Sequence, residues 1–229
     1  MAYIIGVVSQ KGGVGKSTIS RLLAREFVAG GWKAKIADLD SGQSTSYNWL
    51  TRRNRAGIEP FVPVQQFRRV QQALAETPGL DVLILDGLPH ASAMTREIAE
   101  CSDLVIIPTG ASVDDREPGE ALAKELTHLG VAKERVMFAF CRVPAKAAAT
   151  LAEAYYDLTD KGFAVLEGAI PEQAAFIKAN SEGRALTETP FSTLNEQASQ
   201  VAQGVVDCLK RLSAEAAGPV VETQQAGVA

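Results

Sequence analysis

The chain has 229 residues, 46% of them hydrophobic, which suits one α/β domain with a sizeable core. The formal net charge of −4 excludes a surface that is positively charged throughout, although it leaves room for a local basic patch. The three cysteines, Cys101, Cys141 and Cys208, form no C-x-x-C pair, which argues against a disulfide scaffold or a zinc knuckle. The first residues lack the basic and long apolar stretches of a signal peptide, so we expect a cytoplasmic protein.

The beginning of the chain shows the pattern of a strand, a glycine-rich turn, a helix and a second strand. Residues 3–8 form an apolar, β-branched run that is typical of a buried strand. Residues 17–29 place apolar side chains on one helical face, and Gly30 and Gly31 end that helix. Residues 33–39 have the pattern of a second strand. This order predicts a right-handed βαβ unit with parallel strands.

The same alternation continues to residue 212. We expect further strands at residues 58–64, 81–85, 104–108, 135–141 and 163–166. We expect further helices at residues 47–55, 65–76, 91–100, 114–129, 145–158, 172–180 and 192–212. This alternation predicts an α/β fold, a doubly wound, mostly parallel sheet flanked by helices. Residues 213–229 show no helical stripe and predict a disordered tail after a single domain at residues 1–212.

A lysine- and glycine-rich segment lies between the first predicted strand and the first predicted helix. It reads Lys11-Gly12-Gly13-Val14-Gly15-Lys16-Ser17-Thr18. Its glycines let backbone N–H groups turn inward around phosphates, and the helix that follows adds the positive end of its dipole. Lys16 is placed to reach the β and γ phosphates, and the Ser17 hydroxyl to ligate Mg²⁺. The general phosphate-loop pattern has a glycine at position 10, where this chain has Gln10.

The pattern Lys-Gly-Gly-x-Gly-Lys-[Ser/Thr] resembles the deviant Walker A box of the ParA/MinD ATPases, and the resemblance spans roughly residues 3–212. It implies a P-loop NTPase fold for residues 1–212, ATP and Mg²⁺ as cofactors, and hydrolysis of ATP to ADP and phosphate by an ATP-sandwiched homodimer. In that family the extra lysine reaches the phosphates bound by the other subunit, which implies a role in trans for Lys11. A second cation there would stabilise charge on the transferring phosphoryl group. The alternative for Lys11 is a solvent-exposed lysine.

Two carboxylates end the second predicted strand, Asp38 and Asp40. Strand carboxyl ends face the ligand crevice of a parallel sheet, and period-2 alternation predicts both side chains on one side. Asp40 is similar to the family's switch-one aspartate, which implies that it orients the attacking water and lies near the metal. In relatives the switch-one aspartate begins the sequence Asp-Pro-Gln-Gln, whereas this chain has Asp40-Ser41-Gly42-Gln43. We therefore expect switch one to be present but to differ in its detailed shape. For Asp38 the alternative interpretation is a helix-capping or turn residue without a role in the site.

A third carboxylate follows the apolar run at residues 82–85. This pattern resembles a Walker B strand, which implies that Asp86 holds Mg²⁺ through water. Relatives follow this aspartate with Thr-Pro-Pro or Cys-Pro-Pro, and this chain has Gly-Leu-Pro-His. His90 could act as a base, although a polar surface histidine is the better interpretation.

The resemblance places the contacts to the nucleotide base in two segments. They are residues 141–143, which supply Arg142, and residues 170–172, which supply Pro171. Relatives often carry an asparagine in the first segment. Cys141 stands in that place and cannot make the same paired hydrogen bonds. ATP stays the best candidate.

Several features separate the branches of this family. Residues 213–229 contain no Lys or Arg, unlike the basic amphipathic helix with which MinD-type relatives bind membrane, so we expect no membrane partner. Residues 86–90 contain no cysteine for a metal cluster. The resemblance that remains is to short ParA-type positioning ATPases. It implies non-specific DNA binding on the nucleoid, a ParB-like or cargo-adaptor protein that stimulates hydrolysis, and partition of a plasmid, chromosome region or protein cargo. A membrane-surface or protein-scaffold switch and a metabolic P-loop ligase are the alternatives.

Non-specific DNA binding requires clustered cations, because contacts to phosphates supply the affinity. We expect some of the chain's basic residues to form a shared face on the dimer. The candidates are Arg52, Arg53, Arg55, Arg68, Arg69, Lys178, Arg184, Lys210 and Arg211. Each one singly is more typical of an ordinary solvated charge.

Overall fold

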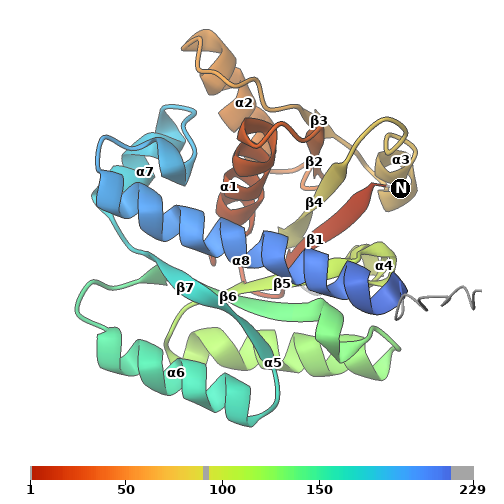
Figure 1. Cartoon of the computed structure of the whole chain (residues 1–229), viewed down its shortest axis with the longest axis vertical. Coiled ribbons are helices and arrows are strands. Elements are labelled where there is room, and N and C mark those ends of the chain that lie inside the picture. Colours follow the sequence, from red (N-terminus) through yellow and green to blue (C-terminus); the bar gives the residue numbers. More distant parts are fainter. Residues whose placement is uncertain (1, 90–92, 218–229) are drawn as a thin grey trace, which may run out of the picture.

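The computed structural model describes residues 2–89 and 93–217. Within these residues seven strands form one sheet in the order β3-β2-β4-β1-β5-β6-β7 (Figure 1). The strands are β1 (Tyr3–Ser9), β2 (Ala34–Asp38), β3 (Val64–Gln66), β4 (Val82–Pro89), β5 (Leu104–Thr109), β6 (Val136–Val143) and β7 (Ala164–Pro171). Every pairing between neighbours in this sheet is parallel, as the sequence predicts.

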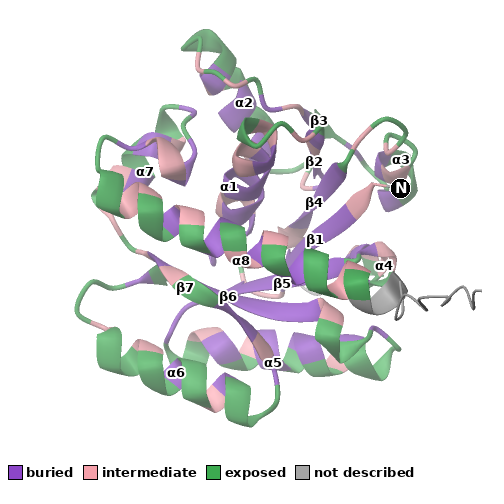
Figure 2. Cartoon of the chain, in the orientation of Figure 1, coloured by how far each residue is buried: buried purple, intermediate pink, exposed green. Residues whose placement is uncertain are grey.

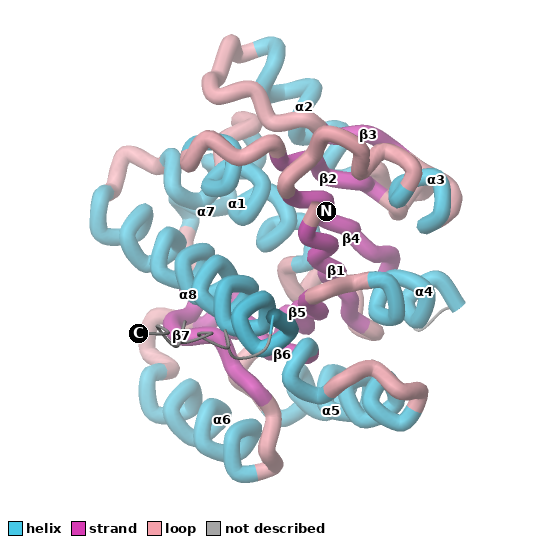
Figure 3. Tube along the Cα trace, turned by 45° about the vertical axis from the view of Figure 1, so that its right-hand side comes forward, coloured by secondary structure: helices cyan, strands magenta, loops and turns pink. Residues whose placement is uncertain are grey.

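Helices cover both faces of the sheet (Figures 1 and 3). They are α1 (Lys16–Ala29), α2 (Thr45–Arg55), α3 (Val70–Leu74), α4 (Ala93–Cys101), α5 (Val113–His128), α6 (Ala148–Asp160), α7 (Ala174–Ser181) and α8 (Ser192–Ala217). Two short 3-10 turns, η1 (Lys133–Arg135) and η2 (Leu186–Glu188), complete the described elements. One apolar cluster joins the sheet to α1, α2, α7 and α8, and a second cluster joins the opposite face to α3, α4, α5 and α6.

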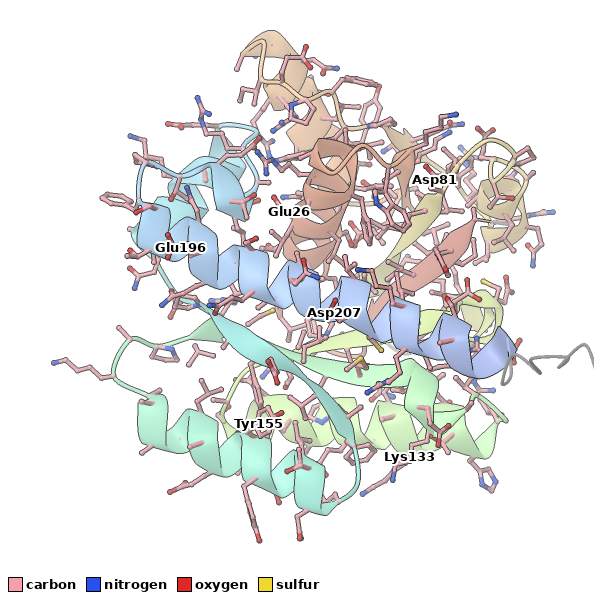
Figure 4. All side chains as sticks on the ribbon, viewed as in Figure 1. Glu26, Asp81, Lys133, Tyr155, Glu196 and Asp207 are labelled. Carbon is pink, nitrogen blue, oxygen red and sulfur yellow. The ribbon has the colours of Figure 1, made fainter. Side chains whose placement is uncertain are left out.

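The central strands are buried on both faces, which explains their continuous apolar sequence (Figure 2). The helices are buried on one side only. Along α8, for example, Glu196 and Asp207 lie on the side of the helix that faces away from the sheet (Figure 4). Val201 and Val205 of the same helix are buried. Among the described helices, none is long and apolar enough to cross a membrane.

The sequence places one strand and one helix wrongly. Residues 58–63 form a loop, and the strand of this region is only β3, which pairs with Ile36–Asp38. Pro60 and Pro63 lack the N–H group that a paired strand needs, which displaces the strand to Val64. The expected helix at residues 65–76 is reduced to the short α3, because β3 and the turn after it occupy its first half.

Other predicted elements are present with shifted ends. Strand β7 continues to Pro171, with Gly168 at a φ of 80° and an irregular register against β6. Helix α8 ends at Ala217, past the expected end at Leu212, so residues 213–217 are helical and not part of a disordered tail. Residues 218–229 of that tail, and His90, lie outside the described residues.

Candidate functional site

The phosphate loop joins the carboxyl end of β1 to the first turn of α1. Gly13 has a φ of 76° and Gly15 a φ of 113°, values that favour glycine, so the backbone itself requires these residues. Gly15 is the N-cap of α1, and no described side chain caps that helix. The first N–H groups of α1 therefore remain available to an anion at the point where the helix dipole is positive.

A cavity of about 430 Å³ opens in front of this loop. Its phosphate-loop side is lined by Gly12, Gly13, Gly15, Lys16, Ser17 and Thr18. The other lining residues include Asp40, Thr45, Pro171, Phe176, Ile177 and Asn180. The structure thus brings most of the predicted loop residues, together with Asp40, Arg142 and Pro171, to one cavity, whereas Lys11, Val14 and Asp86 are not among its described lining residues.

Cys141 lies next to Gly15 of the phosphate loop. It is buried, and a Cβ atom added to Gly15 would come within 3.1 Å of the Cys141 Cβ. Burial raises the pKa of the Cys141 thiol to about 12, so the thiol stays neutral. The Cys141 side chain therefore lies against the loop and is not among the described lining residues of the first cavity.

Lys16 points along the cavity floor. The side chain is almost fully buried, and its Nζ is 3.5 Å from the backbone O of Lys11. Burial lowers the pKa of Lys16, while the carboxylates of Asp86 and Asp40 act in the opposite direction. The lysine is therefore held close to two negative groups, in a place where a phosphate would supply further negative charge.

Asp38 has a structural role at the start of α2. It is fully buried, and its Oδ2 accepts hydrogen bonds of 3.0 Å from the backbone N–H groups of Ser46 and Tyr47 in the first turn of that helix. Its Oδ1 accepts the Asp40 N–H at 3.2 Å. Burial raises the pKa of Asp38 to about 6. The geometry therefore supports the interpretation of Asp38 as a helix-capping residue.

Asp86 lies beside Asp38, its register partner on the neighbouring strand. Its Oδ2 accepts a 2.6 Å hydrogen bond from the Ser46 hydroxyl, which in turn accepts one from Arg21 Nε at 3.2 Å. Within the described residues Asp86 Oδ1 is buried and has no hydrogen-bond partner. Burial raises the pKa of Asp86 and the Ser46 hydroxyl opposes that shift. An unpaired buried carboxylate oxygen behind the cavity fits a group that holds a hydrated cation.

Two further oxygens face the cavity near Asp86. The Ser17 hydroxyl is 2.7 Å from that of Thr45, and Asp40 is half-buried with its Oδ1 accepting the Gln43 N–H at 3.0 Å. In the described part of the chain no group of three or more His, Cys, Asp or Glu forms a metal cage. Mg²⁺ does not need one, since it is commonly bound by one or two side-chain oxygens, phosphates and water. Ser17, Asp40 and Asp86 therefore fit this ion.

Lys11 and Val14 line a second cavity, of about 550 Å³, beside the loop and α6. As far as the described residues define the two cavities, Lys11 does not line the first one. Its Nζ forms an ion pair of 2.5 Å with Asp115 Oδ1 at the start of α5. The trans role of Lys11 stays a prediction, and in the structure its ammonium pairs with Asp115, which does not line the first cavity among the described residues.

Arg142 separates the two cavities. It adopts a φ of 55°, which is uncommon for a residue with a side chain, and its guanidinium donates to the Gly13 O at 2.9 Å and pairs with Glu172 at 3.2 Å. Backbone strain of this kind often accompanies a functional position. Pro171 ends β7 at the far side of the first cavity.

Sequence reasoning missed three polar residues of the site. Arg21 is buried between Ser46 and Asn180, and burial lowers its pKa to about 10. The sequence did contain a signal for Arg21. It lies four residues after Ser17 on the same predicted helix, and residues i and i+4 share a helix face, so Arg21 could have been expected near the phosphate loop. Ser46 and Asn180 carried no signal, since neither belongs to a recognisable pattern.

Arg53 cannot take part in a DNA-binding face, because its side chain is 0% exposed. The guanidinium makes a two-pronged ion pair with Glu188, at 2.7 and 2.8 Å, and donates to the backbone O atoms of Pro60 and Gly183. Arg52 donates to the Asn180 O. Other candidates are exposed, namely Arg55, Arg68, Arg69, Lys178, Arg184, Lys210 and Arg211. Of these, Lys178 and Arg184 lie within 4 Å of the Glu182 carboxylate.

Comparisons with known proteins agree with this geometry. The model of the CobQ/CobB/MinD/ParA nucleotide binding domain matches residues 5–186. A search of curated protein sequences finds no significant match. Among solved structures, the septum site-determining protein MinD of Pyrococcus horikoshii, complexed with Mg-ADP, has a TM-score of 0.72 at 20% identity, covering 94% of this chain and 100% of its own.

Two further structures are similar over most of the chain. A putative plasmid partition protein of Borrelia burgdorferi bound to AMPPNP has a TM-score of 0.69 at 17% identity, covering 90% of this chain and 99% of its own. Apo McdA of Cyanothece has a TM-score of 0.69 at 16% identity, covering 90% and 100%. At these identities the likeness concerns the fold. The family match covers most of the chain, from β1 through η2, and the chain therefore belongs to the CobQ/CobB/MinD/ParA family of nucleotide-binding domains.

Proposed function

We propose that this protein is a ParA-type ATPase that binds Mg-ATP at the first cavity and hydrolyses it as an ATP-sandwiched homodimer. The observation that carries the proposal is the pair of lysines in one loop. Lys16 lies on the cavity floor between Asp40 and Asp86, and Lys11 leaves the loop on the side of the second cavity.

The residues of the first cavity divide the work between binding and activation. The glycines and the start of α1 bind phosphate oxygens, and Lys16 neutralises their charge. Ser17 and Asp86 would hold a magnesium ion, and that ion would supply positive charge next to the phosphates. Asp40 orients the water, since it is the half-buried carboxylate of the site that faces the cavity. Arg142 and Pro171 contact the nucleoside.

Calorimetry tests the binding step. The wild-type chain should take up ATP in the presence of Mg²⁺, whereas Lys16→Ala should lose most of the heat signal. Arg55→Ala is the matched control, because Arg55 is exposed and far along the chain from the loop. A wild-type chain that takes up no adenine nucleotide in a magnesium-dependent manner would overturn the proposal.

The dimer requires a separate test. Lys11→Ala should keep nucleotide affinity but lose hydrolysis and ATP-driven dimerisation, because its target lies on the other subunit. Size-exclusion chromatography with a slowly hydrolysed ATP analogue measures the dimer fraction. An unchanged dimer fraction and turnover would rule out the trans role.

The cellular role that we propose is positioning of a cargo on DNA. The ATP-bound dimer would bind duplex DNA without sequence preference through exposed basic residues, with a partner protein stimulating hydrolysis and release. Arg68 and Arg69, adjacent and exposed before α3, are the first residues to test, while Arg53 is excluded by its burial. A gel-shift assay in low salt with Mg-ATP should show binding that Lys16→Ala lacks. Equal behaviour of the two proteins would remove DNA from the proposal.

A further inference from the structure

The lining of the first cavity is polar in one part and apolar in another. The phosphate loop and the start of α1 contribute glycines, Lys16 and hydroxyl groups, which suit a chain of phosphates. The larger apolar residues among the described lining come, apart from Pro89, from the segment between β7 and η2. They are Ile170, Pro171, Phe176, Ile177 and Leu186. An apolar wall of this kind suits a flat, uncharged ring and not a phosphate, so it is where the base of a nucleotide fits.

Asn180, near the end of α7, is a neutral polar residue in the same segment. It is half-buried and lines the first cavity. Arg21 Nη1 donates to the side-chain Oδ1 of Asn180 at 3.5 Å, and Arg52 Nη2 donates to its backbone O at 3.3 Å. The side chain and the main chain of Asn180 are therefore each held by a guanidinium group from another helix, α1 or α2.

The contact with Arg21 decides which end of the Asn180 amide is left for a ligand. A guanidinium group can only donate hydrogen bonds, so the atom of the amide that faces Arg21 has to be the carbonyl oxygen. The Nδ2 group then lies on the other side of the amide, and among the described hydrogen bonds it has no acceptor. Asn180 therefore keeps its N–H groups as the donors that it can offer to a base.

Arg21 is itself fixed, so the amide is oriented before a nucleotide arrives. The residue is buried, and its Nε donates to the Ser46 hydroxyl at 3.2 Å. That hydroxyl donates in turn to Asp86 Oδ2 at 2.6 Å. Arg21 also belongs to α1, the helix that follows directly on the phosphate loop. A polar contact that selects a ligand requires a side chain whose orientation is set by its supporting neighbours, and Asn180 meets this requirement.

We infer that Asn180 recognises the base of the bound nucleotide by donating an N–H to a ring nitrogen of adenine, and that Arg21 is the positioning residue that turns the amide this way. This inference rests on the proposed binding of ATP in the first cavity. Adenine carries acceptor nitrogens at N1, N3 and N7, each of which can receive such a donor. An acceptor in place of the Asn180 N–H would repel the same nitrogens.

Calorimetry with Mg²⁺ tests the contact by comparing ATP with 1-deaza-, 3-deaza- and 7-deaza-ATP, in each of which C–H replaces one ring nitrogen. At least one analogue should bind the wild-type chain about tenfold more weakly than ATP, the value of one hydrogen bond. Asn180→Ala should bind ATP about tenfold more weakly and should no longer distinguish ATP from that analogue. A purely structural role of Asn180 would instead weaken all four ligands equally and keep the preference. That result, or a wild-type chain without any preference, would overturn the inference.

Asn180→Asp tests the orientation of the amide. It keeps the shape and gives Arg21 a stronger acceptor, so the melting temperature should not fall, but it removes the N–H donors. ATP should bind this variant at least about tenfold more weakly than the wild type. Asn54→Asp, the same change at an exposed position of α2, should stay within about twofold. Wild-type affinity of Asn180→Asp for ATP would overturn the inference. A wild-type chain that binds neither ATP nor the analogues would instead overturn the proposed function, and the inference with it.

Discussion

The buried ion pair between Arg53 and Glu188 offers the sharpest test of how this fold is held together. Arg53 lies on α2 and Glu188 on η2, and their side chains are 0% and 7% exposed. All three guanidinium nitrogens donate, to both Glu188 oxygens and to the backbone O atoms of Pro60 and Gly183. The ring of Trp49 lies 5.2 Å from the guanidinium carbon. We predict that Arg53→Met strongly lowers the free energy of unfolding.

The magnitude follows from what remains after the change. Removing one partner of a buried pair costs about 3–5 kcal/mol. Glu188 would keep Arg25 Nε at 3.2 Å and the Ala185 N–H at 2.7 Å, which places the cost near the lower end, about 3 kcal/mol. For a chain of this size that corresponds to a melting temperature lower by about 6–12 °C. Arg55→Met, an exposed change on the same helix, should cost less than about 0.5 kcal/mol.

The assay is urea unfolding followed by circular dichroism, repeated for Glu188→Gln and for the double variant. Because both single variants break the same pair, the double variant should cost clearly less than the sum of the two. If Arg53→Met cost less than about 1 kcal/mol, or if the two costs simply added, the pair would not be what joins α2 to η2.

The same pair has a defined pH dependence. Burial would raise the pKa of Glu188, but hydrogen bonds from Arg53 and the Ala185 N–H lower it below its ordinary value of 4.5. A carboxylate with a lowered pKa stabilises the folded state fully above pH 4.5 and loses that contribution as the pH falls through the folded value. The stability difference between wild type and Glu188→Gln should therefore be constant near neutral pH and decrease in acid.

Three further predictions concern the site and its support. Gly15→Ala should abolish nucleotide binding in calorimetry, because a φ of 113° and a Cβ contact of 3.1 Å to Cys141 would displace the loop; binding at wild-type affinity would contradict this. Ser46→Ala should destabilise the fold by about 1–3 kcal/mol in thermal melts, since Asp86 Oδ2 would lose its donor. Gly183→Ala should be among the least tolerated glycine changes, because its Cβ would come within 2.3 Å of the α2 backbone, and soluble expression with an unchanged melting temperature would refute this.

The sequence predicts the centre of this molecule well, because the signals there are local. A glycine-rich turn between a strand and a helix can be recognised within a few residues, and the loop at Gly12–Thr18 lies where expected. The apolar runs of β1, β4 and β5 are equally legible, because both faces of these strands are buried. The carboxyl end of β2 and the second half of β4 then bring Asp40 and Asp86 to the side of the sheet where the loop lies.

What could not be predicted depends on contacts between distant segments. The sequence leaves Asp38 open between a site carboxylate and a capping or turn residue, and only the fold shows that the α2 backbone occupies it while Asp40 stays at the cavity. Arg53 has the pattern of a surface charge until Glu188, far along the chain, is placed beside it. Charged residues carry no mark in the sequence that distinguishes a solvated side chain from a buried one with a distant partner.

Helix α2 is anchored at both of its ends, and this limits how the protein can move. At its first turn Ser46 bonds to Asp86, behind the cavity, and at its last turn Arg52 and Arg53 bond to backbone O atoms at the end of α7. Its 11 residues span about 16 Å. A helix tied in this way tilts as one body, so a displacement at its Ser46 end also moves its Arg52 and Arg53 end. The junction of α2 with α7 also belongs to the cavity wall, because Asn180 lines that cavity and lies 3.5 Å from Arg21, the residue that holds the Ser46 hydroxyl.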